Sequence, residues 1–177
     1  YMPDGAAEAR AEQLATLDTL AHQKLTGNAT AEIVEKIRPV LNGGTTRTER
    51  LMKLFVREYD KASKLPERLV HETSKATALA QESWKKARAA SDFKIFRDDL
   101  KKLLDLKSEA AECYGYAENK YDALLDLFEP GMSVSHLKPV FSNLAKGTRE
   151  LLAMVEPVKD RADDSVLYTK FDKNQQL

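Results

Sequence analysis

The feature that most constrains this chain is an apolar side chain every three or four residues, over long stretches that Gly and Pro rarely interrupt. The 177 residues include only 7 Gly and 6 Pro. Side chains three and four residues apart share one face of an α-helix, whereas a half-buried strand alternates every second residue. Alternation is confined to Val166–Tyr168, which is too short to count as a strand. The pattern therefore predicts an all-α fold, with about six to seven helices and long antiparallel helices packed as a bundle-like lobe.

Turn residues and capping residues divide the sequence into these helices. Pro39 with Gly43-Gly44 ends the second segment, and Pro130-Gly131 ends the sixth, because Pro restricts the preceding residue and Gly permits the turn. The predicted helices span about 6–25, a short segment capped by Thr30, 46–64, 66–90, a segment capped by Asp92, a short segment around Ala123–Leu125, and 135–155.

Four of these helices carry an apolar stripe that we expect to face the core. The stripes are Leu51, Leu54, Phe55, Tyr59 and Ala62 in the third helix; Leu69, Thr73, Ala76, Ala80, Trp84 and Ala87 in the fourth; Phe96, Leu100, Leu103, Ala110 and Cys113 in the fifth; and Leu137, Phe141, Leu144, Leu151 and Val155 in the last.

The composition predicts one helical domain over residues 1–177 and excludes two classes of partner. Lys and Arg total 28 and Asp and Glu total 28, so the formal net charge of zero argues against nucleic-acid binding. No apolar run is long enough to span a bilayer, so we expect no membrane partner. Cys113 is the single cysteine, and we expect a buried small hydrophobe in a reducing, cytoplasmic setting.

The sequence contains half of a zinc-peptidase motif. HExxH places two His ligands one turn apart on a helix, with a Glu beside the metal-bound water. Here His71 and Glu72 are followed by Lys75, where the second His would stand. A cation repels zinc, so we interpret His71 and Glu72 as ordinary helix surface. The sequence thus predicts no catalytic residue, no metal ligand and no cofactor in this chain.

Both ends of the sequence suggest a fragment of a longer chain, truncated at each end. The first residue is Tyr1, ahead of Met2. At the other end, Asp172 is placed to cap a helix of which only one turn follows before Leu177.

One block goes beyond helical pattern. Tyr121–Met132 reads YDALLDLFEPGM and resembles the YDALLD-x-[YF]-EPGM stretch of the carboxypeptidase Taq family, thermostable HExxH zinc carboxypeptidases. Three further segments resemble that family in the same order: Tyr1–Gly5 with the helix containing Arg10–Leu14, Leu65–Leu69, and Ala80–Trp84. Together these segments cover nearly the whole chain.

The resemblance implies an all-helical metallocarboxypeptidase that removes C-terminal residues from peptides and forms a homodimer. The family's zinc ligands, HExxH plus a downstream Glu, have no counterpart in these residues, so zinc is expected only in a longer parent protein. This chain would then be a non-catalytic amino-terminal lobe that forms one wall of the substrate groove. Two alternatives remain: a stand-alone helical interaction module, and the amino-terminal lobe of an oligoendopeptidase.

Five residues of the matching segments are candidates for facing that groove. They are Tyr121, Asp122, Glu129, Met132 and Met2. A purely structural role is the other interpretation of the Glu129–Met132 turn. In that case Glu129 bonds local amides, Gly131 supplies a positive φ and Met132 fills a gap.

Overall fold

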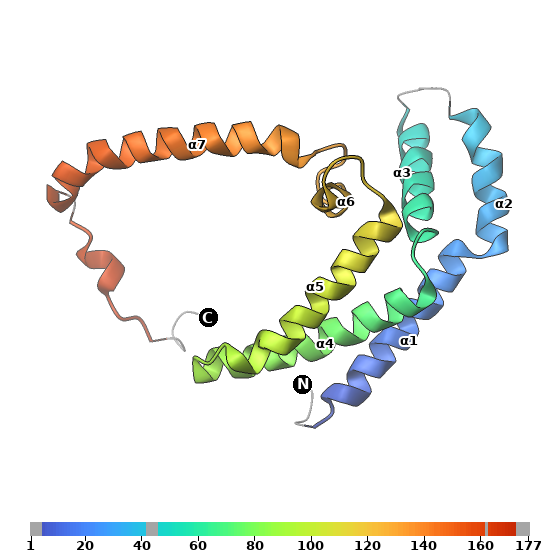
Figure 1. Ribbon diagram of the computed structural model, residues 1–177, viewed down its shortest axis with the longest axis horizontal. Coiled ribbons are helices and arrows are strands. Elements are labelled where there is room, and N and C mark those ends of the chain that lie inside the picture. The colour runs from blue at the N-terminus through green and yellow to red at the C-terminus, as the bar shows by residue number, and fades with distance from the viewer. Residues whose placement is uncertain (1–4, 42–45, 162, 173–177) are drawn as a thin grey trace. The chain divides into compact units, whose positions relative to one another are not determined.

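A computed structural model describes residues 5–41, 46–161 and 163–172. These residues form seven α-helices and three 3₁₀-helices, and none of them lies in a strand (Figure 1). The all-α prediction is therefore confirmed for the described part. The elements are α1 (Ala7–Thr26), α2 (Asn28–Ile37), η1 (Arg38–Val40), α3 (Arg47–Ala62), α4 (Glu67–Ala90), α5 (Lys94–Tyr114), α6 (Lys120–Leu125), α7 (Val134–Val155), η2 (Glu156–Arg161) and η3 (Ser165–Tyr168).

The chain divides into two compact units, residues 1–131 and 132–177. In the first unit, α4 is the central helix: α1 and α5 both pack along it, and both run in the opposite direction to it (Figure 1). Whether 1–177 behaves as one domain stays a prediction.

The core of the first unit is thin and built largely from alanine. A cluster of Leu69, Ala76, Leu106 and Ala110 joins α4 to α5, and Ala11 and Ala15 are fully buried on α1. Such small side chains let neighbouring helices approach closely, as the predicted stripe of α4 suggested. Trp84 is an exception in that stripe, because its ring is exposed and lies under the Arg88 guanidinium.

Local capping explains most helix ends. Thr46 closes a capping box with Glu49 at the start of α3, and Asp92 Oδ1 accepts a hydrogen bond from Lys94 N at the start of α5. The predicted cap at Thr30 is wrong. Gly27 is extended, with φ −71° and ψ 164°, so α2 begins directly after it, and the Thr30 hydroxyl instead donates to Lys24 O at the end of α1.

The predicted inner face of α3 is only partly correct, because Phe55, Tyr59 and Ala62 are half-buried but Leu51 and Leu54 are not. Leu51 is 57% exposed and Leu54 is 55% exposed, whereas the buried residue of α3 is Val56. The three-and-four spacing correctly predicted a helix. Which side of the helix is covered depends on α1 and α2, the helices that pack against α3, and no local pattern encodes that.

The second unit has no core among its described residues. Every described residue of α7 leaves its side chain at least partly accessible, and the predicted inner residues Phe141, Leu144, Leu151 and Val155 are exposed. No described residue of this unit covers the stripe, so within the unit this burial prediction is wrong. Pro139 lies inside α7, near its start. The predicted helical turn after Asp172 lies outside the described residues, and no described helix is long and apolar enough to cross a membrane.

Candidate functional site

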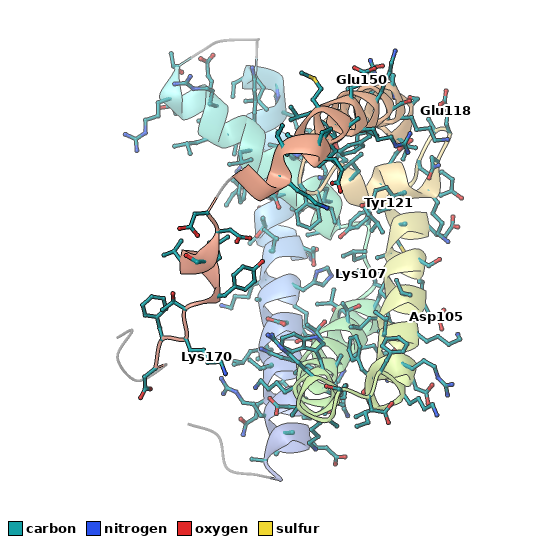
Figure 2. The ribbon with its side chains drawn as sticks, turned by 90° about the vertical axis from the view of Figure 1, so that its left-hand side faces the viewer. Asp105, Lys107, Glu118, Tyr121, Glu150 and Lys170 are labelled. Atoms are coloured by element: carbon teal, nitrogen blue, oxygen red, sulfur yellow. The ribbon has the colours of Figure 1, made fainter. Side chains whose placement is uncertain are left out.

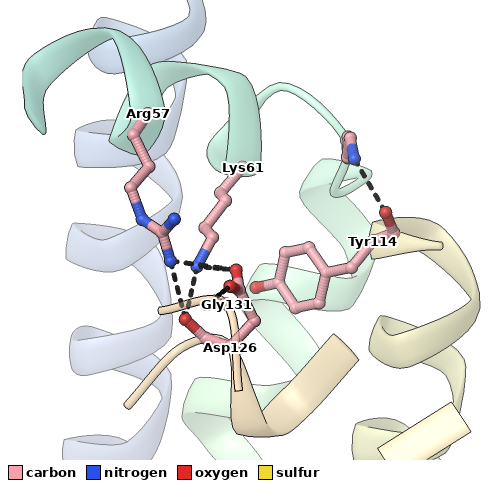
Figure 3. A network of polar contacts seen from close by, with 6 residues as sticks. Arg57, Lys61, Tyr114, Asp126 and Gly131 are labelled. Carbon is pink, nitrogen blue, oxygen red and sulfur yellow. Dashed lines mark hydrogen bonds and ion pairs between the residues drawn. The ribbon is translucent and has the colours of Figure 1, made fainter. Parts of the chain in front are cut away.

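The candidate site is the turn that follows α6, in the block that resembles the peptidase motif. Asp126 is the centre of its polar contacts (Figure 3). Its Oδ2 lies 2.9 Å from Arg57 Nη2 and 2.8 Å from Lys61 Nζ. Its backbone carbonyl accepts hydrogen bonds from the same two side chains, at 2.7 Å and 3.0 Å. Two cations from successive turns of α3 thus hold the end of α6.

The remaining oxygen of Asp126 organises the turn itself. Oδ1 accepts the backbone N–H of Gly131 at 2.8 Å. Gly131 has a φ of +80°, a conformation that costs any residue with a Cβ. The positive φ predicted for Gly131 is confirmed. The local amide is bonded by Asp126, however, and not by Glu129, whose side chain is exposed.

Electrostatics favour the charged form of Asp126. Partial burial raises the pKa of this carboxyl, but the hydrogen bonds from Lys61 and Gly131 N–H and the charges of Lys61 and Arg57 outweigh it, so the pKa lies below its ordinary value. Nearby, burial raises the pKa of the Tyr114 phenol, and Tyr114 O accepts a hydrogen bond from Lys64 Nζ (Figure 3). The contacts around the turn thus favour an ionised Asp126 and a neutral Tyr114 phenol.

The five residues predicted to face a groove are only partly brought together. Tyr121 and Asp122 lie on α6, where Tyr121 is exposed and Asn119 caps the helix through Tyr121 N. Glu129 is exposed in the turn. Met132 belongs to the second unit, and Met2 lies outside the described residues. Their role in a groove stays a prediction.

His71 has a role that sequence reasoning missed. Its Nε2 lies 3.0 Å from Glu12 Oε1, and Lys75 Nζ lies 2.7 Å from Glu12 Oε2. Two side chains one turn apart on α4 therefore bind the same carboxylate of α1. Glu72 pairs with Arg68 at 3.0 Å. His71 and Lys75 thus connect α4 to α1, whereas Glu72 pairs within α4.

The described residues do not fit a catalytic metal. Within residues 5–41, 46–161 and 163–172, no three His, Cys, Asp or Glu side chains are grouped closely enough to hold one. At the position where HExxH needs a second ligand, the ammonium group of Lys75 is paired with Glu12. No chemical step can be assigned to a metal held by these residues.

Comparison with known proteins gives the family. Residues 1–177 match the family described as carboxypeptidase Taq (M32) metallopeptidase. Carboxypeptidase 1 of Bacillus subtilis is 29% identical over 98% of this chain, and thermostable carboxypeptidase 1 of Thermus thermophilus is 32% identical over 96% of it. The protein belongs to the carboxypeptidase Taq (M32) family, a family of metal-dependent peptidases, which confirms the resemblance noted from Tyr121–Met132.

Solved structures agree with this assignment. The crystal structure titled BsuCP superposes with a TM-score of 0.90 at 29% identity, covering 99% of this chain and 35% of that chain. A structure of Pyrococcus furiosus carboxypeptidase gives a TM-score of 0.71 at 32% identity and covers 87% of this chain. The chain spans 35% and 36% of the first two curated relatives, so it corresponds to about a third of such an enzyme.

Asp126, Arg57 and Lys61 are the residues that sequence reasoning missed. Asp126 was visible as the last acid of YDALLD, and Arg57 and Lys61 are four residues apart and share one face of a helix. Nothing local in the sequence connects residue 57 with residue 126, because that contact depends on how α3 and α6 are placed.

Proposed function

We propose that this chain is the non-catalytic amino-terminal lobe of a metallocarboxypeptidase that removes C-terminal residues from peptides. The observation that carries the proposal is the family match over residues 1–177 in a chain only about a third as long as its relatives. The missing length is ample for a metal centre with its substrate site, and the described residues fit no catalytic metal.

In this proposal the lobe shapes one wall of the substrate groove and performs no chemistry. The parent enzyme holds zinc or another divalent metal, acts on peptides, forms a homodimer and works in the cytoplasm. A wall of a substrate groove must keep its shape, and two features of this lobe support rigidity. The Gly131 amide donates to Asp126, whose carboxylate pairs with Arg57 and Lys61 of α3, and Glu12 of α1 pairs with Lys75 of α4.

The test compares the full-length gene product with the 177-residue chain. Both are assayed on a peptide with a free C-terminus and on the same peptide amidated there, with metal content measured in parallel. We expect the full-length protein to bind a divalent metal and to cleave only the free peptide, and we expect the 177-residue chain to do neither. Equal cleavage of both peptides contradicts a carboxypeptidase. A reading frame without an HExxH downstream of Leu177 contradicts the lobe.

A further inference from the structure

A groove runs along α4 between α1 and α5. It has a volume of about 490 Å³ and a mainly apolar lining, with Leu14 on α1, Leu65 just before α4, Leu69, Val70 and Ala78 on α4, and Ala110 and Tyr114 on α5. From Leu69 to Gln81 the floor extends about 18 Å, at 1.5 Å per helical residue. That is the length of three turns of a docked helix.

Two exposed apolar side chains lie next to residues of the groove lining, although neither belongs to the lining itself. Leu17 follows Leu14 by three residues, and Leu104 precedes Lys107 by three. Both are 60% exposed. Since α1 and α5 each pack along α4 and not closely on one another, the space between them is the place that a fourth helix takes in a bundle.

The groove also carries one charge of each sign. Asp18 stands on the α1 wall and Lys107 on the α5 wall, where Figure 2 shows the Lys107 side chain between the two helices. Within the described residues neither makes an ion pair, although many charges on the same helices do, among them Glu12, Lys75 and Lys101. A helix seated here would therefore present a base to one flank and an acid to the other.

We propose that the groove between α1 and α5 seats an amphipathic helix from the part of the parent peptidase that lies beyond Leu177. An acidic side chain of that helix pairs with Lys107, and a basic one pairs with Asp18. This inference rests on the proposed function, because the relatives are about three times as long as this chain. A crystallised relative with the same arrangement of these helices carries that additional length.

The test uses a carbodiimide, which joins a lysine amine to a carboxylate only when the two are in contact. In the full-length gene product we expect Lys107 to be cross-linked to an Asp or Glu downstream of residue 177. Mixing isotope-labelled and unlabelled protein identifies a link between two copies, and that result overturns the proposal. So does a Lys107 that is acetylated as readily in the full-length protein as in the 177-residue chain.

A charge reversal gives an independent readout. Lys107→Glu should lower the Tm of the full-length protein by about 2–4 °C and change that of the 177-residue chain by less than about 1 °C. Lys102→Glu, on the same helix but outside the groove lining, should act equally in both. An equal effect of Lys107→Glu in the two proteins overturns the proposal. If the full-length protein is an active peptidase but shows no cross-link from Lys107, only the proposed occupant of the groove is refuted. If the full-length gene product has no metal motif downstream of Leu177, the proposed function is refuted.

Discussion

The Nζ atom of Lys75 lies 2.7 Å from Oε2 of Glu12, and this ion pair joins α4 to α1. The hydrogen bond from Lys75 is the main reason that the pKa of Glu12 lies below its usual value and the pKa of Lys75 above its own. His71 Nε2 donates a hydrogen bond to the other carboxylate oxygen of Glu12, at 3.0 Å. The residues that look like half of a zinc motif thus stabilise the packing of two helices.

The Glu12–Lys75 pair gives a pH dependence with a definite sign. Because the pKa of Glu12 in the fold lies below its unfolded value of 4.5, its stabilisation is complete above that pH and is lost as pH falls through the folded value. The pKa of Lys75 is raised above 10.5, so its contribution is complete below that pH and is lost as pH rises through the folded value. We expect a stability plateau between these limits.

Glu12→Gln tests this pair. The substitution should lower the free energy of unfolding at pH 7 and flatten its decline between pH 5 and 3, as measured by urea titration followed by circular dichroism. Glu32→Gln, which removes an exposed carboxylate for which no pair is described, is the matched control. The same acid profile in wild type and in Glu12→Gln would show that the pair contributes nothing.

A second prediction concerns the small core. Leu69 is 1% exposed and belongs, with Ala76 and Leu106, to the cluster that joins α4 to α5. Leu69→Ala should cost about 2–5 kcal/mol in the free energy of unfolding, because it removes buried methyl groups and leaves a cavity. Leu51→Ala, at an exposed site, should stay within about 0.5 kcal/mol. A similar loss at both sites would mean that the face of Leu51 is covered in solution.

These contrasts show what the sequence could and could not predict. Helix positions follow from local periodicity and caps, and the predicted range 66–90 lies within one residue of the observed Glu67–Ala90. The side of each helix that is buried depends on neighbours: Leu69 and Ala80 had them, whereas Leu51 and Phe141 did not. A stripe predicts that a helix needs a partner, but it does not say which helix that partner is.

In the candidate site, too, local features could be predicted from the sequence and tertiary contacts could not. Gly131 was predicted from the local chemistry of a Pro-Gly turn, and its φ of +80° confirms it. The ion pairs of Asp126 with Arg57 and Lys61 were not predicted, because they join distant parts of the sequence through tertiary packing. For the same reason, the sequence could not identify Glu12 on α1 as the partner of Lys75.

A third prediction separates the two acids of the turn. Asp126→Asn should cost about 1 kcal/mol, a value discounted because the carboxylate is partly exposed, since it weakens the contacts with Arg57 and Lys61. It should also speed hydrogen exchange of the Gly131 amide, which would lose its charged acceptor. Glu129→Gln should leave that amide unchanged. Faster exchange of the Gly131 amide in Glu129→Gln than in Asp126→Asn would contradict this prediction, because it would make Glu129 the acceptor of that amide.

The last prediction concerns the backbone at Gly131. A Cβ at this position meets no atom within 4 Å, so any cost of Gly131→Ala comes from the φ of +80° and not from crowding. Forcing alanine into this left-handed region should lower the free energy of unfolding by about 1 kcal/mol. Gly147→Ala is the matched control, because Gly147 lies inside α7 with equally open space around it, and alanine favours a helix by about 1 kcal/mol. Urea unfolding should thus give effects of opposite sign for the same chemical change, and a gain in stability at Gly131 would mean that the turn does not hold the positive φ in solution.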